Sequence, residues 1–300
     1  MINDKVFIPP FKTQGIKSKI VPLIKATITI TNNTTWIEPF MGSGVVGLNI
    51  APYNAIFADI NPHIINFYNQ LKNGNITSTI VREFLTEQGT LLAKKDKEYY
   101  YFVRERFNKE HNPLDFLFLN RSCFNGMIRF NKNNNYNVPY GHKRERFSKA
   151  YITKIVNQVK YFEQKLHCNN WTFLCQSFEN TIFMADSNSF IYCDPPYIGR
   201  NVDYYDSWTE DQEWQLKSSL LTSNARFMVS TWDFNQYRIN PYIDLIWGEY
   251  HKITQSHFYF VGAKEINRNS ITEALLINYP KTDFDIVNNY EIGEQLKLDY

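Results

Sequence analysis

The chain has 300 residues, of which 43% are hydrophobic, so it can bury one large or two moderate cores without stabilisation by disulfides or metals. Its four cysteines form no CxxC pair and its six histidines lack ligand spacing, so the sequence indicates neither a disulfide framework nor a metal site. No apolar run approaches the roughly 18 residues of a membrane span, and the first residues lack a signal-peptide pattern. We therefore expect a soluble, cytoplasmic protein that makes no contact with a membrane.

The formal net charge of +2 hides a contrast between two parts of the chain. Residues 63–166 contain 18 Lys and Arg against 9 Asp and Glu, a net charge of +9, whereas the remainder has a net charge of −7. A basic segment in an otherwise acidic protein is typical of a surface that binds a polyanion. A solvated helical surface has the same composition, so the charge alone leaves both interpretations open.

Short apolar runs predict strands at 35–40, 54–60, 171–178, 189–197, 225–231 and 273–279. Polar helical segments lie between them, and this alternation favours an α/β fold whose mostly parallel sheet is covered by helices on both faces. Residues 63–166 instead show polar and aromatic helical periodicity with an Asn-rich loop, which predicts a mainly helical insertion. The expected organisation is a catalytic domain of residues 1–62 and 167–300 and an inserted domain of residues 63–166, with a cleft between them.

A glycine-rich sequence, GSGVVG, directly follows the first predicted strand. Gly42 and Gly44 permit a tight turn and a close approach to a ligand, and Asp59, at the end of the next strand, can accept hydrogen bonds from ribose hydroxyls. The pattern suits a dinucleotide, S-adenosylmethionine or a purely structural turn. Glu38 precedes the glycines, and its charge would repel a pyrophosphate but attract a sulfonium and an ammonium group. This favours S-adenosylmethionine as the cofactor.

A second loop, upstream of the first strand, contains Gln14, Gly15 and Lys17. These residues can meet the methionyl carboxylate of the same cofactor. Simple surface exposure is the alternative explanation for Lys17.

The stretch IYCDPPYIGR ends a predicted buried strand with an acid, two prolines and a tyrosine. Pro195 and Pro196 lack amide hydrogens, so the chain forms a stiff loop where open α/β sheets bind their ligands. The carboxylate of Asp194 and the carbonyl of Pro195 can accept the two hydrogens of an exocyclic amine and direct its lone pair at a methyl group. Tyr197 offers a flat face on which a base rotated out of a duplex can stack. A structural turn with an exposed acid is the alternative, and Cys193 is a poor nucleophile because its apolar strand would raise its pKa.

Together, VFIPPFKTQGIKSK, WIEPFMGSGVVGLNIAP, DFLFLNRSCFNGMIRFN and YCDPPYIGR make the chain resemble the Dam-type DNA adenine N6-methyltransferases, nearly end to end. Within that family it is most similar to the modification enzymes of the EcoRV type. The resemblance implies a Rossmann-like, S-adenosylmethionine-dependent methyltransferase sheet of seven strands with a DNA-recognition insertion. It assigns cofactor binding to Gln14, Lys17, Phe40, Gly42, Gly44, Asp59, Phe178 and Asp194, and catalysis to Asp194, Pro195, Pro196 and Tyr197.

The resemblance also implies contacts with double-stranded DNA. Phe124, Asn125 and Arg129 match a loop that enters DNA, where an aromatic ring can fill the stack as a base leaves and an arginine can read base edges. Lys12 matches a residue near the first base pair of the site. The remaining candidates are assigned to phosphates, with solvated charge as the alternative for each one: Lys143, Arg144 and Arg146.

The expected activity is therefore transfer of a methyl group from S-adenosylmethionine to adenine N6 in double-stranded DNA by base flipping. The resemblance suggests GATATC as the target and a role in a restriction-modification system, with a cognate endonuclease that acts on the same site without binding this protein. Rival interpretations are a nicotinamide oxidoreductase that uses GSGVVG, a DNA-binding module without catalysis, and methylation of RNA or of cytosine N4. The first leaves DPPY and the basic segment without a role, and the intact DPPY argues against the second.

Overall fold

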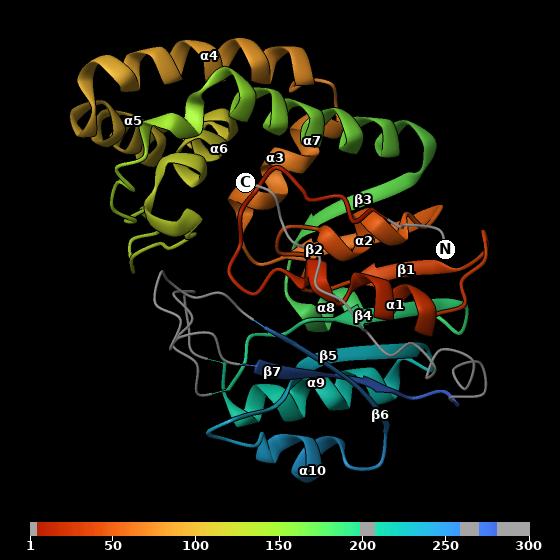
Figure 1. Ribbon diagram of the computed structural model, residues 1–300. Helices are drawn as coiled ribbons and strands as arrows, with labels where there is room; N and C mark the ends of the chain where they lie inside the picture. The colour runs from red at the N-terminus through yellow and green to blue at the C-terminus, as the bar shows by residue number, and fades with distance from the viewer. Residues whose placement is uncertain (1–4, 199–207, 259–269, 281–300) are drawn as a thin grey trace.

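The computed structural model describes residues 5–198, 208–258 and 270–280, which form a seven-stranded sheet with helices on both faces (Figure 1). The strand order is β3-β2-β1-β4-β5-β7-β6. Neighbours from β3 to β5 are parallel, whereas β7 runs antiparallel to both β5 and β6. The strands are β1 (Thr35–Glu38), β2 (Asn54–Asp59), β3 (Asn170–Cys175), β4 (Ser189–Cys193), β5 (Arg226–Asn235), β6 (His251–Phe258) and β7 (Ser270–Ile277). This confirms the predicted α/β fold with a mostly parallel sheet.

Six of these strands overlap the six predicted runs, and β6 is the strand that sequence reasoning missed. Its sequence, HKITQSHF, contains no continuous apolar run. Among the described residues, β6 lies at the edge of the sheet and pairs with β7 alone, so few of its side chains need to be apolar.

The two faces of the sheet bury alternate residues of each strand, as the side-chain period of two requires. On β4, Phe190 and Tyr192 belong to one hydrophobic cluster, whereas Ile191 and Cys193 belong to a second cluster on the other face. The first cluster includes α1 (Val21–Thr27), α2 (Val45–Ile50) and α3 (Pro62–Lys72). The second includes α8 (Phe178–Ile182), α9 (Glu210–Thr222) and α10 (Pro241–Trp247). Burial on both faces explains why β4 is apolar from Phe190 to its end.

The inserted segment consists of helices that gather at one end of the molecule, at the top of Figure 1. The helices are α4 (Ser78–Lys95), α5 (Lys97–Glu110), α6 (Pro113–Ser122) and α7 (Lys149–Cys168). Between α6 and α7 lie two short 3-10 helices, η2 (Phe124–Gly126) and η3 (Arg144–Phe147), and a third, η1 (Lys17–Lys19), precedes α1. Within the three described ranges, no helix combines the length and the apolarity needed to cross a membrane.

Helix α3 joins the inserted helices to the sheet. Asn61 caps it by accepting hydrogen bonds from two backbone amides, and Pro62 occupies its first turn. On one side, the Tyr68 ring stacks with Phe173 of β3 at a centroid distance of 5.5 Å, and its hydroxyl donates to the carbonyl of Ser43 at 2.7 Å. On the other side, Phe67 shares one hydrophobic cluster with residues of α4 to α7. The division at residue 63 that the sequence suggests therefore falls inside a helix that contacts both parts.

Candidate active site

A cavity of about 420 Å³ lies where the parallel strands β1, β2 and β4 end. The chain proceeds from β1 to β2 on one side and from β4 to β5 on the other, so β1 and β4 flank the point where the strand order reverses. A crevice at the carboxyl ends of strands at such a point is the usual ligand site of open α/β sheets. Residues from the N-terminal loop, the glycine loop, α8 and the DPPY loop all line it.

Backbone hydrogen bonds fix the glycine loop at both ends: the Met41 amide donates to the carbonyl of Ala58 and the Gly44 amide donates to the carbonyl of Met41, both at 2.8 Å. Gly42 and Gly44 have φ values of +50° and +74°, a region that favours glycine, and Gly44 is the N-cap of α2. Gly47 allows α2 to pack closely on the sheet, because a Cβ there would lie 2.1 Å from the Phe57 ring. Gly42 lines the cavity, whereas Gly44 is not among the lining residues. The conformational role of the glycines is therefore visible even though only Gly42 faces the cavity.

Two carboxylates lie beside this loop. Asp59 accepts hydrogen bonds from the amides of Gly42 and Asn61, both at 2.8 Å, and so fixes the loop to the end of β2. Glu38 accepts hydrogen bonds from Trp36 Nε1 and the Gly47 amide, both at 3.0 Å. Burial raises the pKa of both carboxyls, and the pKa of Glu38 rises to about 8 because its two hydrogen bonds only partly offset the loss of water. A cationic ligand would stabilise the ionised form of both.

Three aromatic rings form one wall of the cavity. Phe40 stacks on Phe178 with a centroid distance of 5.4 Å, and Trp208 packs edge-on against Phe40 at 5.6 Å. Trp208, which sequence reasoning missed, donates its indole N–H to the buried carboxylate of Glu213 on α9. Glu213 also accepts a hydrogen bond from Trp247 of α10 at 2.8 Å. This wall offers a flat apolar surface of the kind that holds an adenine ring.

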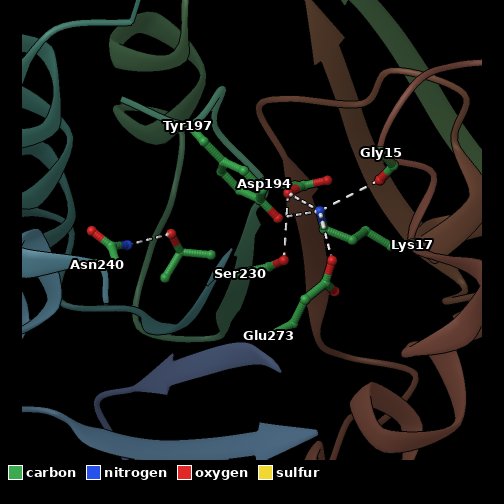
Figure 2. Close-up of polar contacts among 8 residues, drawn as sticks. Gly15, Lys17, Asp194, Tyr197, Ser230, Asn240 and Glu273 are labelled. Atoms are coloured by element: carbon green, nitrogen blue, oxygen red, sulfur yellow. Dashed lines mark hydrogen bonds and ion pairs between the residues drawn. The ribbon is translucent and has the colours of Figure 1, made fainter. Parts of the chain in front are cut away.

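Lys17 lies at the centre of a buried polar cluster, shown in Figure 2. Its Nζ atom is 3.0 Å from Oδ1 of Asp194 and donates a hydrogen bond of 2.6 Å to the hydroxyl of Tyr197. It also lies 3.8 Å from Glu273 of β7 and 3.4 Å from the carbonyl of Gly15. Only 4% of the Lys17 side chain is exposed, which decides against the simple surface exposure that the sequence left open. In this arrangement its ammonium contacts groups of the protein itself, of which the Tyr197 hydroxyl and the Asp194 carboxylate are the nearest.

The carboxylate of Asp194 follows β4 directly and has a second partner in Ser230 of β5, whose hydroxyl lies 3.4 Å from Oδ1. Burial raises the pKa of Asp194 to about 6, and Lys17 limits this rise by stabilising the charged form. For Lys17, burial alone would lower the pKa, but the nearby Asp194, Tyr197 and Glu273 outweigh it and hold the pKa well above 10.5. Lys17 is therefore charged at neutral pH, and Asp194 is mostly ionised.

The structure brings the two predicted sets of site residues together around this one cavity. Cofactor and catalytic candidates that line it are Gln14, Lys17, Phe40, Gly42, Asp59, Phe178, Asp194, Pro195, Pro196 and Tyr197. Cys193 lies outside the cavity lining, and burial raises its pKa well above 9.0, as expected for a cysteine that is not a nucleophile. Beyond Trp208, sequence reasoning missed Ser230 and Glu273. Glu273 offered a signal, because it is an acid at the start of an apolar predicted strand.

The candidate DNA loop follows α6. Asn125 and Gly126 have positive φ values of +52° and +69°, which turns the chain sharply. Phe124, at 50% exposure, and Asn125 are both exposed there. The turn packs against Lys12, since a Cβ at Gly126 would lie 2.7 Å from the Lys12 side chain, and the amide of Lys12 donates to Asn120 at 2.8 Å. The N-terminal segment thus contacts both the cavity, through Lys17, and this loop, through Lys12.

The basic candidates differ in their surroundings. Burial, together with Arg146 and Arg121, lowers the pKa of Lys12 to about 8. Arg129 donates to the side chain of Asn137 at 2.7 Å, and Arg146 donates to the carbonyls of Cys123 and Arg121 at 2.7 and 3.3 Å. These two guanidinium groups are therefore held by contacts within the loop region.

Lys143 is exposed. Arg144 begins η3, and its side chain lies outside the described part of the chain.

The residues present fit an S-adenosyl cofactor better than a pyrophosphate. The cavity combines an aromatic wall with three carboxylates, those of Glu38, Asp59 and Asp194. The cation nearest to them, Lys17, is already paired with two carboxylates. Such a site favours a ligand with an aromatic ring and positive charge over one that carries negative charge.

Comparison of the sequence with protein families and with curated proteins gives the following matches. Residues 14–259 match the family described as D12 class N6 adenine-specific DNA methyltransferase. The type II methyltransferase M.FokI of Planomicrobium okeanokoites is 30% identical over 274 residues, which are 87% of this chain and 41% of that protein. The DNA adenine methylases of Serratia marcescens and Haemophilus influenzae are each 38% identical, over 54% and 63% of this chain and 57% and 63% of their own lengths. The chain therefore spans less than two thirds of each of these relatives.

Proposed function

Because this chain belongs to the D12 class N6 adenine-specific DNA methyltransferase family, we propose that it transfers a methyl group from S-adenosylmethionine to the N6 amine of adenine in double-stranded DNA. The family membership confirms the resemblance to DNA adenine N6-methyltransferases, and the likeness to enzymes of the EcoRV type stays a prediction. The observation that carries the proposal is the carboxylate of Asp194, which stands at the end of β4 in the cavity and is held by Lys17 and Ser230.

Asp194 acts on the amine of the flipped adenine. An ionised carboxylate accepts one N6 hydrogen, which directs the nitrogen lone pair and leaves a base ready to take the proton that the nitrogen releases. Lys17 and Ser230 fix the orientation of the carboxylate, and the stiff Pro195-Pro196 backbone fixes its position. Tyr197, whose hydroxyl is held by Lys17, provides the surface on which the base stacks. Most of the acceleration then comes from positioning and electrostatics.

The cofactor site lies in the same cavity. When bound, S-adenosylmethionine supplies a methyl group activated by its sulfonium. We assign its adenine to the wall of Phe40, Phe178 and Trp208, and its ribose hydroxyls to Asp59. Glu38, whose raised pKa a neighbouring cation would lower, holds the positively charged end in its ionised form, and Gln14 meets the methionyl group from the N-terminal loop. Exclusion of water by the aromatic wall strengthens these charge interactions.

Residues 63–166 are proposed to contact the DNA. Their net charge of +9 matches a polyanion, and Phe124 and Asn125 project from the loop after α6. Phe124 is placed to fill the space that a flipped base leaves, while Lys12 and Arg129 contact base edges. Lys143, Arg144 and Arg146 are assigned to phosphates, Arg146 through the donors that its bonds to Cys123 and Arg121 leave available.

We further propose GATATC as the target and modification, within a restriction-modification system, as the role. The likeness to a type II methyltransferase supports the modification role. The target rests on the resemblance of the sequence motifs alone. A cognate endonuclease would act on the same site without binding this chain. Such an enzyme works inside the cell, where both its DNA and its cofactor are present.

The test incubates the protein with duplexes of random sequence and with a GATATC duplex in the presence of labelled S-adenosylmethionine. Nucleoside analysis is expected to yield N6-methyladenine in the duplex, and mapping is expected to locate it in the target. Product on cytosine N4 or only on RNA would contradict the choice of substrate. Full activity in Asp194→Ala would refute the mechanism.

A further inference from the structure

Glu273 lies on β7, between β5 and the edge strand β6, and far from the cofactor loop in sequence, yet it reaches the catalytic cluster. Strand β7 pairs with β5, and in this register Glu273 lies opposite Trp232, two residues after Ser230. One carboxylate oxygen of Glu273 is 3.8 Å from Nζ of Lys17 (Figure 2). Glu273 and Lys17 are only 3% and 4% exposed, so water screens little of their interaction.

The charges of this cluster explain why a second carboxylate is useful. Lys17 orients Asp194, but its positive charge also cancels the negative charge of Asp194 close to the amine. During transfer, positive charge moves from the sulfonium to the amine nitrogen, and a neutral ion pair stabilises that charge poorly. With both carboxylates ionised, Lys17, Asp194 and Glu273 together have a net charge of −1. This negative charge stabilises the positive charge that develops on the amine nitrogen.

We propose that Glu273 is a positioning residue for methyl transfer, which shares the ammonium of Lys17 with Asp194 and keeps the net charge beside the target amine negative. This inference rests on the proposed function. Glu273 itself lies outside the residues that line the cavity and acts through Lys17.

A specific pH effect follows from the same arrangement. The charged and titratable groups that face Asp194 are Lys17 of η1, Glu273 of β7, Tyr192 and Cys193 of β4, Tyr197 of the DPPY loop and Glu38 of β1. After burial and Lys17, Glu273 is the next influence on the pKa of Asp194, and it raises that pKa. Removal of its charge therefore lowers the pKa of Asp194, so that Asp194 stays ionised to a lower pH.

The experiment measures kcat and KM for a cognate duplex from pH 5 to pH 9 in the wild type, Glu273→Gln and Glu273→Asp. The matched control is Asp233→Asn, which removes another buried carboxylate. Asp233 lies on β5, is 6% exposed and pairs with Lys252 at 3.2 Å, outside the cavity lining. Calorimetric binding of S-adenosylmethionine and thermal unfolding accompany each variant.

We expect Glu273→Gln to lower kcat by about tenfold or more, with KM little changed, and to move the acid limb of the profile to lower pH. Glu273→Asp retains the charge and should keep the wild-type acid limb with a smaller loss of kcat. Asp233→Asn should leave kcat and the acid limb unchanged. A purely structural role predicts lower stability in both Glu273 variants without any movement of the acid limb.

A folded Glu273→Gln with wild-type kcat and acid limb would overturn the inference. If that variant does not fold, Glu273→Asp decides, because its shorter side chain withdraws the carboxylate from Lys17. A folded Asp variant that matches the wild type at every pH would then refute the role. Absence of methylation in the wild type on DNA would instead count against the proposed function, so the two failures are distinguishable.

Discussion

Replacement of Gly47 by alanine tests how the cofactor loop is supported. A Cβ at this position would lie 2.1 Å from Cε1 and 2.6 Å from Cζ of Phe57, and 2.7 Å from Oε2 of Glu38. The Phe57 ring is 1% exposed and packs against Trp171 and Phe173 at centroid distances of 5.2 and 5.4 Å, so it has little room to move. Helix α2 must therefore shift away from the sheet.

The expected loss of stability follows from two opposing effects. Overpacking of a close-packed core costs about 1–3 kcal/mol, and the short distance to a confined ring places this site at the upper end. Alanine in place of glycine in a helix returns about 1 kcal/mol. The free energy of unfolding should thus fall by about 2 kcal/mol. Movement of α2 also lengthens the hydrogen bond that the Gly47 amide donates to Glu38, and it displaces the turn at Gly42. The affinity for the cofactor should therefore fall as well.

Urea denaturation followed by tryptophan fluorescence measures the stability, and calorimetry measures the affinity for S-adenosylmethionine. Gly89→Ala is the matched control, because its Cβ would lie 2.6 Å from Phe147 in the helical insertion. It should lower stability while leaving cofactor affinity intact. Wild-type stability and affinity in Gly47→Ala would show that α2 is not held against Phe57 in the way described.

Three further predictions concern chemistry and binding. Because the pKa of Asp194 is about 6 and its ionised form accepts the amine hydrogen, kcat should fall tenfold per pH unit below about 6; a rate that is flat to pH 5 would contradict this. Phe178→Ala should weaken binding of S-adenosylmethionine about tenfold by calorimetry, whereas Phe183→Ala, at 91% exposure, should not. Phe124→Ala should reduce the 2-aminopurine fluorescence that reports base flipping in a cognate duplex. Tyr53→Ala serves as control, because Tyr53 is 53% exposed and directly precedes β2, whose other end meets the cavity at Asp59; an equal loss there would refute a specific role.

The sequence predicted those parts of the site that depend on strand ends. Asp59 and Asp194 each follow or end an apolar run, and in a parallel sheet such ends meet at one edge. The left-handed backbone at Gly42 and Gly44 could also be anticipated, because a G-x-G-x-x-G pattern directly after a strand is typical of a tight turn into a helix. Local pattern was sufficient because each of these features is set by residues close to it in sequence.

Other parts of the site depend on contacts between distant segments. Strand β7 lies between β5 and β6, and no periodicity indicates that this insertion brings Glu273 within 3.8 Å of Lys17. Trp208 packs on Phe40 across the carboxyl edge of the sheet, which only the folded chain shows. The net charge of the segment also could not indicate that the guanidinium of Arg146 donates to backbone carbonyls. Composition shows how many charged side chains are present, but not which of them form hydrogen bonds within the protein.

The segment from Lys12 to Lys17 has a consequence for protein engineering. Its first residue is fastened by its backbone to Asn120 and packs against the turn at Gly126, and its last residue holds Asp194. A chimaera that exchanges only residues 63–166 between relatives would pack the new loop against residues 12–17 of the original protein. Exchanges of DNA specificity in this fold should therefore move residues 12–17 together with the insertion, because the two segments pack against each other.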